Sequence, residues 1–418
     1  MHDQEPRGEN RWLAASLPVL ALATSSIEAV RQAALAAGAT GGIIDAPIDP
    51  ERVAAAFGSE KLFRLQGEGA PAFAPMSGFF AARDGWVRTH ANYPHHAERL
   101  ARILNLTTTD KESVAHAVSL RSAQGLEDEA AQAGAILVRV RGEEDWRVSP
   151  MGHAASIGDL VEITTRDDSS ELVLRSGELP LTGLRVLDMT RVLAGPVCTR
   201  TLALLGADVL RIDPPNPAEI AWQHLDTGQG KRSALLDVRA NLGMTQDLLD
   251  TADVLVTGYR PGAIESLGLS KPAGLIGARV NAWGDHGPWS SRRGFDSIVQ
   301  AASGIALIES RDATTPGALP AQALDHASGY LLASGIITAL VRRADDGRGR
   351  DVRVSLARTA HELLTSPGRT LDHPVPWSPT QQVAVSHGDL ITARPALPGF
   401  DDYPFPSHPW GSDTANWS

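Results

Sequence analysis

Between residues 181 and 366 the chain alternates short apolar runs with stretches that have the spacing of amphipathic helices. The runs at 184–189, 208–212 and 253–257 are each built mainly from Val, Leu, Ile and Met. Strands that are buried on both faces have this composition, and helical connections between them make the strands parallel. The pattern therefore predicts an α/β fold: a Rossmann-like parallel sheet domain with helices on both faces, plus a smaller α+β domain.

Local residues mark where the predicted helices begin and end. Pro196 suits the first turn of a helix that follows the first strand, and Gly206 suits its end. The spacing at 242–251 predicts a further helix before the strand at 253–257. In a sheet of this kind ligands bind where the carboxyl ends of the strands open onto loops. We therefore expect site residues in the loops 190–195, 213–217, 258–262 and 281–287.

Composition divides the chain into three regions. Residues 1–178 are rich in alanine and largely helical in pattern, and we expect a small domain there. Residues 179–370 hold the predicted Rossmann-like domain. Residues 371–418 carry much of the proline, histidine and tryptophan, which predicts an extended tail, since proline interrupts helices and central strands.

Charge and cysteine content narrow the class of protein. A formal net charge of -11 argues against a nucleic-acid partner, which needs a basic face. The single cysteine, Cys198, forms no internal disulfide, so a reducing compartment fits, and we expect a buried structural thiol. The apolar run 12–23 follows acidic residues and contains Pro18, which disfavours a secretion signal. We expect no membrane partner and a cytoplasmic location.

The glycines and histidines predict no resident cofactor or metal. The loop 190–195 after the first strand lacks the GxGxxG fingerprint, and the glycines at 38–42 lack the lysine of a P-loop, so NAD and ATP are disfavoured. His90, His95 and His96 have no carboxylate at a metal-motif spacing. We expect solvated or hydrogen-bonding histidines there, and no metal site.

Ordered motifs in the middle region point to a family. They are LTGLRVLDMTRVLAGP at 181–196, LGADVLRIDPP at 205–215, GKRSALLD at 230–237, ADVLVTGYRPG at 252–262, GFDSIVQA at 294–301 and GRGRDVRVS at 347–355. Together they resemble the class III CoA-transferase family (CaiB/BaiF type), which includes formyl-CoA transferase, carnitine CoA-transferase and α-methylacyl-CoA racemase. The resemblance implies an enzyme that moves CoA between an acyl-CoA thioester and a small carboxylic acid. CoA is then a substrate, not a permanently bound cofactor.

The resemblance places the nucleophile at Asp325, ahead of the apolar run 330–341 and a Gly-Arg-Gly turn that begins at Gly347. The implied mechanism passes through an acyl-aspartyl anhydride and an aspartyl-CoA thioester. A position near a helix start is expected to keep the carboxylate ionised, and amides at Gly329 or nearby loops are expected to stabilise oxyanions. Local sequence alone favours a simple helix N-cap for Asp325, and it is the ordered motifs around the residue that favour the catalytic role.

The resemblance also carries over a set of CoA contacts. Arg239 and Arg260 suit phosphate groups, because guanidinium donors pair with phosphate oxygens. Pro214 and Ser266 stand where formyl-CoA transferase has arginines, so the position in which the phosphates of CoA bind stays open. The full set of predicted contacts is Arg191, Val192, Leu193, Ala194, Leu236, Arg239, Gly258, Tyr259, Arg260, Asn281 and Trp283.

Two alternative functions stay open. The racemase branch has a histidine at the position of Phe295, and phenylalanine carries no proton, so an acyl-CoA racemase or isomerase needs another base. His326, next to Asp325 in the sequence, is the candidate for that base. The second alternative is a CoA-binding pseudoenzyme, suggested by the missing arginines and by an unusual order of parts.

That order places segments at 80–90 and 126–164 ahead of the catalytic region, although they resemble the small domain that follows it in other family members. The arrangement implies a circular permutation or a degenerate copy, and surface chain ends that lie close together tolerate either. The family forms interlocked dimers, so we expect a homodimer.

Overall fold

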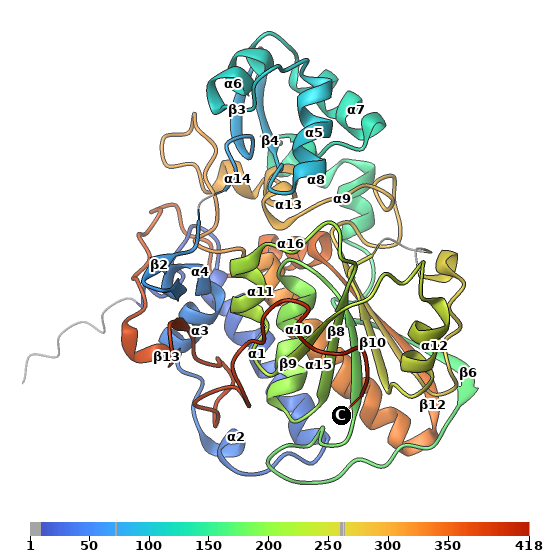
Figure 1. Ribbon diagram of the computed structural model, residues 1–418. Coiled ribbons are helices and arrows are strands. Elements are labelled where there is room, and N and C mark those ends of the chain that lie inside the picture. Colours follow the sequence, from blue (N-terminus) through green and yellow to red (C-terminus); the bar gives the residue numbers. More distant parts are fainter. Residues whose placement is uncertain (1–9, 72, 260–261, 263, 418) are drawn as a thin grey trace, which may run out of the picture.

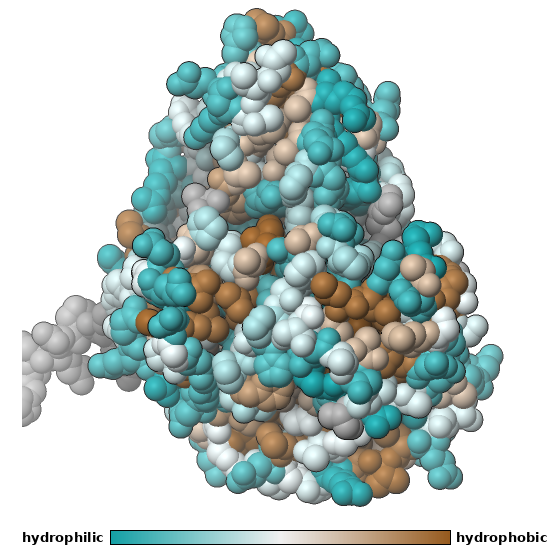
Figure 2. All heavy atoms as spheres, viewed as in Figure 1, coloured by the Kyte–Doolittle hydropathy of each residue, from teal (hydrophilic) through white to brown (hydrophobic). Residues whose placement is uncertain are grey.

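The structure, a computed structural model, describes residues 10–71, 73–259, 262 and 264–417. It consists of a large α/β body and a smaller lobe that stands above it (Figure 1). On the face shown in Figure 2 the larger groups of hydrophobic side chains lie on the body, below the lobe. The lobe and the body meet around the candidate site described below.

A seven-stranded sheet forms the centre of the body, in the order β6-β12-β11-β10-β7-β8-β9. All neighbouring pairs are parallel except β12 with β6, which is antiparallel. The predicted Rossmann-like sheet is therefore confirmed. The strands span β6 (Glu162–Ser169), β7 (Arg185–Met189), β8 (Asp208–Asp213), β9 (Lys231–Leu235), β10 (Val254–Thr257), β11 (Ile276–Asn281) and β12 (Arg348–Ser355).

Alternating residues of the strands face opposite sides of the sheet. Val186 belongs to the main core with the helices of one face, whereas Leu187 packs with Leu248 and Leu249 on the other. The first face is covered by α1 (Val19–Ala36), α10 (Ala194–Leu204) and α15 (Ala323–Asp346), and the second by α12 (Leu242–Asp250). Both faces are thus buried, as the continuous apolar strands predicted.

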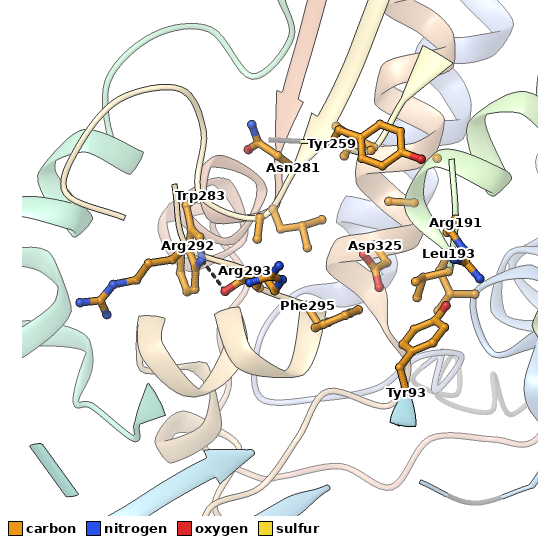
Figure 3. Close-up of a pocket in the computed structure, with 18 of the residues that line it drawn as sticks. Tyr93, Arg191, Leu193, Tyr259, Asn281, Trp283, Arg292, Arg293, Phe295 and Asp325 are labelled. Atoms are coloured by element: carbon orange, nitrogen blue, oxygen red, sulfur yellow. Dashed lines mark hydrogen bonds between the residues drawn. The ribbon is translucent and has the colours of Figure 1, made fainter. Parts of the chain in front are cut away.

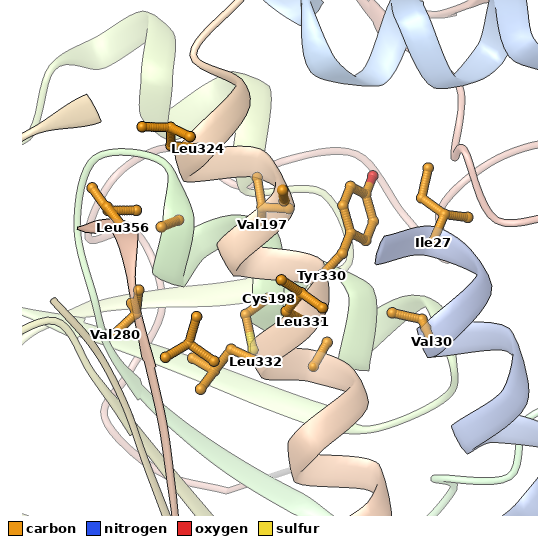
Figure 4. Close-up of a cluster of buried hydrophobic side chains, with 14 of the residues drawn as sticks. Ile27, Val30, Val197, Cys198, Val280, Leu324, Tyr330, Leu331, Leu332 and Leu356 are labelled. Carbon is orange, nitrogen blue, oxygen red and sulfur yellow. The ribbon is translucent and has the colours of Figure 1, made fainter. Parts of the chain in front are cut away.

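Helix α15 is the central element of the body. It is long and apolar enough to cross a membrane by length and composition, but 89% of that stretch is buried inside the protein. Leu324, Tyr330 and Leu332 contact side chains of α10, β11 and α1 (Figure 4). Cys198 of α10 lies in the same cluster and is fully buried, which confirms the predicted structural thiol. The helix ends at Gly347, whose φ of 73° caps it before β12 begins.

The small lobe is a three-stranded antiparallel sheet in the order β3-β4-β5, packed against helices with its own hydrophobic core. Its elements are β3 (Gly78–Ala82), β4 (Gly85–Thr89), α5 (Pro94–Ile103), α6 (Lys111–Ser119), α7 (Ala123–Ala133) and β5 (Leu137–Arg139). Short helices beneath it are α8 (Glu143–Arg147), α9 (Pro150–Ala155), α13 (Asp296–Ser303), α14 (Ile305–Ile308) and α16 (Leu356–Thr365). The lobe thus sits directly over the segment that leads into α13.

The predicted regions 1–178, 179–370 and 371–418 share elements in space. Helix α1 of the first region packs along α15, and β6 supplies the edge of the central sheet. A four-stranded sheet, β13-β14-β1-β2, joins the first region to the last. Its strands and their neighbours are β1 (Arg64–Leu65), β2 (Glu68–Gly69), β13 (Ala384–His387), β14 (Leu390–Ala393), α2 (Gly42–Asp45), α3 (Pro50–Phe57) and α4 (Ser59–Leu62), with α11 (Ala221–Thr227) nearby. The domain boundaries themselves stay a prediction.

The last residues run along the free edge of β9. The amide of Asp413 donates to the carbonyl of Ser233 over 2.8 Å, and the amide of Ser233 donates to the Asp413 carboxylate over 2.7 Å. Trp417 donates from its indole nitrogen to the carbonyl of Leu248. The chain end therefore covers backbone groups that an edge strand otherwise exposes.

Candidate functional site

A cavity of about 380 Å³ opens between the carboxyl ends of the central strands and the small lobe (Figure 3). The loops after β7 and β10, the end of β11 and the first turns of α10 and α15 form the body side. The start of α5 and the segment ahead of α13 form the lobe side. The position agrees with the general rule that ligands bind at the carboxyl edge of such sheets.

Most of the predicted site residues meet in this cavity. Asp325 lies in its wall, and the loops around it bring eight of the predicted CoA contacts to the same space. These are Arg191, Val192, Leu193, Ala194, Gly258, Tyr259, Asn281 and Trp283.

Two predicted contacts, Leu236 and Arg239, are not among the described residues that line the cavity. Leu236 is buried in the core on the far face of the sheet, and Arg239 is exposed beyond it. Both follow β9, which is the edge strand two positions from β7, so their loop lies away from Asp325. Arg260 lies outside the described residues. The roles of these three residues stay a prediction.

Asp325 occupies the first turn of α15 and points into the cavity (Figure 3). Its residue surface is only 7% exposed. Burial and the nearby carboxylate of Asp296 raise the pKa of Asp325 well above its ordinary value. Desolvation and a like charge thus act against the expected effect of the helix start, and both favour the protonated acid.

Asp296 holds the start of α15 in place. Its Oδ2 accepts a hydrogen bond of 3.0 Å from the backbone N–H of Asp325, and its Oδ1 accepts one from the side-chain amide of Gln300. Burial raises the pKa of Asp296 to about 6. Two buried carboxyl groups thus lie on adjoining helix starts, and sharing a proton avoids placing two charges together. The GFDSIVQA motif contained Asp296, but nothing in the motif indicated its contact with α15.

Phe295 lines the cavity, and as the sequence indicated its ring has no proton to give or take in acid/base catalysis. Its ring stacks on His90 with 3.7 Å between centroids and 6° between planes, and His96 approaches its edge. Burial lowers the pKa of His90 and of His96 to about 3, so both are neutral near pH 7. His326 lies outside the cavity lining and stacks on Phe57. The structure therefore offers no support for His326 as a substitute base.

The lobe contributes residues that sequence reasoning missed. Tyr93, His95 and His96 line the cavity from the start of α5, and Arg292 and Arg293 line it from the segment ahead of α13. Solvated or hydrogen-bonding histidines were expected at these positions, and His96 is not solvated, since it is only 5% exposed. The signal available was the adjacency of Arg292 and Arg293 to a family motif, but no local pattern connects residues 93–96 to Asp325.

Gly329 has a packing role. It lies inside α15, where its amide belongs to the helical hydrogen-bond pattern, so it is not a free oxyanion donor. A Cβ at this position meets the carbonyl oxygen of Ala194 at 2.5 Å and Cβ of Val197 at 2.9 Å. The absence of a side chain therefore allows α10 and α15 to touch one turn below Asp325.

The cavity combines one carboxyl group with three guanidinium groups and apolar walls. Arg191 contacts Glu219 and Asp213 at 3.5 Å and 3.6 Å, and Arg292 contacts Glu127 at 3.7 Å. Leu193, Trp283 and Phe295 supply the apolar surface. Among the described residues, no group of three or more His, Cys, Asp and Glu side chains is arranged to hold a metal. The arrangement suits an anionic ligand with a long apolar part.

Comparisons with known proteins agree with the motifs. A model of the CoA-transferase family III matches residues 181–382. A protein named acetyl-coenzyme A transferase nodX, from Hypoxylon pulicicidum, is 33% identical over 47% of this chain and 36% of its own length. A probable fatty acyl-CoA transferase, Rv3272 of Mycobacterium tuberculosis, is 35% identical over 42% of this chain and 50% of its own.

Two further matches cover similar shares of the chain. The succinyl-CoA–L-malate CoA-transferase alpha subunit of Chloroflexus aurantiacus is 31% identical over 51% of this chain and 54% of its own length. The crystal structure of the Mycobacterium tuberculosis protein matches with a TM-score of 0.41 over 44% of this chain and 56% of that one. The chain spans about half the length, or less, of the curated relatives it matches. The matched region contains Asp325, and the lobe residues 93–96 lie outside it.

Proposed function

Because a model of the CoA-transferase family III matches residues 181–382, we propose that the chain transfers CoA between an acyl-CoA thioester and a carboxylic acid, with Asp325 as nucleophile. The observation that carries the proposal is the position of the Asp325 carboxyl group. It lies in the wall of a cavity that also holds eight of the predicted CoA contacts. A carboxyl group in such a place can reach the thioester carbon of a bound acyl-CoA.

The proposed reaction has four steps. A carboxylate oxygen of Asp325 attacks the thioester carbon, the C–S bond breaks, and CoA leaves as a thiolate with an acyl-aspartyl anhydride on the enzyme. The thiolate attacks the aspartyl carbonyl carbon, which releases the donor acid and leaves an aspartyl-CoA thioester. The acceptor carboxylate attacks that carbon and expels the thiolate again. The thiolate then takes the acceptor acyl group and restores Asp325.

The environment of Asp325 sets a condition on the first step. The attacking form is the carboxylate, whereas burial and Asp296 favour the protonated acid. The Asp296 carboxyl group accepts a hydrogen bond from the Asp325 backbone, which fixes the start of α15 from which the Asp325 side chain reaches the cavity. Transfer is therefore expected to accelerate as pH rises through the pKa of Asp325.

The cavity walls suit the parts of CoA. The guanidinium groups of Arg191, Arg292 and Arg293 give the site the positive charge that phosphates and the acceptor carboxylate require. Leu193 and Trp283 offer apolar contact for the pantetheine arm. CoA is bound and released as a substrate in this proposal. Assembly as a homodimer and a cytoplasmic location are further proposals, drawn from the family resemblance and the single cysteine.

The proposal is tested by trapping the intermediates. The protein is incubated with acetyl-CoA, succinyl-CoA or a long-chain acyl-CoA, treated with hydroxylamine, and searched by mass spectrometry for a hydroxamate at Asp325. We expect the adduct in the native protein and none in Asp325→Asn, with turnover in the variant lowered by about a thousandfold or more. Asp312→Asn removes an exposed carboxylate outside the cavity and serves as the matched control.

A CoA-binding protein without activity and an acyl-CoA isomerase would each give a different result with the same acyl-CoA compounds. CoA binding without adduct or exchange identifies a CoA-binding protein without transferase activity. Uptake of deuterium at the α-carbon of the acyl group, without exchange of CoA, identifies an isomerase. Either result overturns the transferase proposal.

A further inference from the structure

Val192, in the cavity wall, has an unusual backbone conformation. Its φ is 70°, in the left-handed region that a β-branched residue rarely adopts. Such a conformation persists only where surrounding groups hold it, and it is concentrated at functional sites. The loop from Thr190 to Gly195 must therefore be held by contacts from outside the loop.

Glu219 supplies those contacts. Its Oε2 accepts a hydrogen bond of 3.2 Å from the backbone N–H of Val192, and Nε of Arg191 lies 3.5 Å from the same oxygen. Arg191 also donates from Nη2 to the carbonyl oxygen of Pro217 over 2.9 Å. One carboxylate oxygen therefore fixes the two residues that form the strained turn.

The other oxygen of Glu219 reaches the small lobe. The hydroxyl of Tyr93 donates a hydrogen bond to Oε1, which also accepts one of 2.9 Å from the amide of Ile220. The guanidinium of Arg191 lies over the Tyr93 ring, 5.4 Å from its centroid, and the two residues lie together at one side of the cavity (Figure 3). Glu219 thus joins the loop of the body to the lobe at the side of the cavity where the two meet, without lining it.

Glu219 is held as an anion. Its residue surface is 8% exposed, and burial alone would raise its pKa. Arg211, which donates to Oε2 over 2.7 Å, and Arg191 instead hold the pKa of Glu219 to about 2. The carboxylate is therefore ionised near neutral pH and accepts hydrogen bonds from Val192 and Tyr93 in that form.

We propose that Glu219 is a positioning residue of this site, which holds the Arg191–Val192 turn in its left-handed conformation and the Tyr93 wall against it. The inference rests on the proposed function only in that the cavity is taken to bind CoA. An ion pair that served stability alone would need only the contact between Glu219 and Arg211. The additional bonds to a strained amide and to the lobe place both walls of the cavity under the control of one side chain.

The test uses glycine at position 192, because glycine adopts a positive φ without help. The affinity of the full chain for CoA is measured by calorimetry in four proteins: native, Glu219→Gln, Val192→Gly and the double variant. If Glu219 acts through the strained turn, Glu219→Gln weakens CoA binding by about tenfold with Val192 present and by less than about threefold with glycine there. An equal loss in both backgrounds, or no loss in either, overturns the proposal.

Hydrogen exchange provides a readout that needs no ligand. Replacing the carboxylate by a neutral amide in Glu219→Gln weakens the hydrogen bond from Val192 N–H, which should accelerate exchange in the peptide that contains residues 190–195. Unchanged exchange in that peptide contradicts the proposal even if the protein does not bind CoA, whereas absence of CoA binding and transfer in the native protein contradicts the proposed function. Glu219→Asp keeps the charge beside Arg211 but shortens the side chain. If Glu219→Gln fails to fold, the aspartate variant must show the same faster exchange, and unchanged exchange in it counts against the proposal.

Discussion

The pair Asp296 and Asp325 concentrates the chemistry of the site in two buried carboxyl groups. Each lies in the first turn of a helix, and the side chain of the first accepts a hydrogen bond from the backbone of the second. The arrangement orients Asp325, but it also places a second potential charge beside it. Asp296 therefore affects both the orientation and the pKa of Asp325. A substitution of Asp296 that removes the charge but keeps an acceptor oxygen separates the two effects.

Asp296→Asn should shift the pH profile of transfer towards acid. Asp325 has a raised pKa, so the reactive carboxylate is scarce at low pH, and kcat/KM rises as pH increases through that pKa. Removing the like charge lowers the pKa of Asp325, so the rising limb should move down by about one pH unit or more, while burial keeps the pKa above its ordinary value. The measurement is kcat/KM for acetyl-CoA across the acid and neutral range. Asp312→Asn is the control, and an unmoved limb in Asp296→Asn means that Asp296 does not set this acidity.

At the scale of elements, the contact between α10 and α15 determines where Asp325 lies. Gly329 allows the carbonyl of Ala194, in the first turn of α10, to approach α15 directly. The loop of Arg191 to Leu193 enters α10 at the same point. The two helices therefore bring the proposed nucleophile and the predicted CoA-binding loop together through one close backbone contact.

Gly329→Ala should push these helices apart. The added methyl group meets the Ala194 oxygen at 2.5 Å, and backbone cannot yield as a flexible side chain does. We expect the free energy of unfolding to fall by about 1–3 kcal/mol, with a loss of transfer activity. Gly243→Ala in α12 is the matched control, because a Cβ there meets nothing within 4 Å and alanine favours a helix. Denaturant unfolding of both variants checks the prediction, and equal stability of the two contradicts it.

At the scale of the whole molecule, segments distant in sequence close the structure. The lobe at 78–139 covers the cavity, α1 covers α15, and the chain end covers β9. Asp413 both pairs with the backbone of Ser233 and accepts from the His408 ring. The edge of the central sheet is thereby closed by the chain's own last residues.

Removal of residues 409–418 should expose that edge. Unpaired backbone groups of β9 then become available to other chains, so we expect a melting temperature lower by several degrees and concentration-dependent aggregation. Asp413→Asn keeps the backbone pairing and should change both properties much less. Thermal unfolding and light scattering of the two variants make the comparison. A truncated protein that stays monodisperse with an unchanged melting temperature contradicts this role for the tail.

Local sequence was sufficient to predict the central sheet and the loops that form much of the body side of the cavity. Continuous apolar strands joined by helices can bury both faces only as a parallel sheet, and the loops at its carboxyl edge must then lie together. For this reason the loops that hold Arg191, Tyr259 and Asn281 could be expected at one edge of the sheet, whereas Asp325 and the individual contacts were predicted only from the resemblance to the class III CoA-transferases. Gly347 likewise marks the end of α15, because glycine can adopt the positive φ of a helix C-cap without steric cost.

Only the tertiary structure decided what surrounds Asp325. Tyr93 and His96 reach the cavity from a lobe more than two hundred residues away in sequence, and Glu219 contacts Val192 through a fold in the chain that no periodicity encodes. The pKa of Asp325 depends on burial and on Asp296, both of which exist only after packing. Strand and helix patterns follow from backbone geometry over a few residues, whereas desolvation and charge proximity depend on which distant surfaces meet.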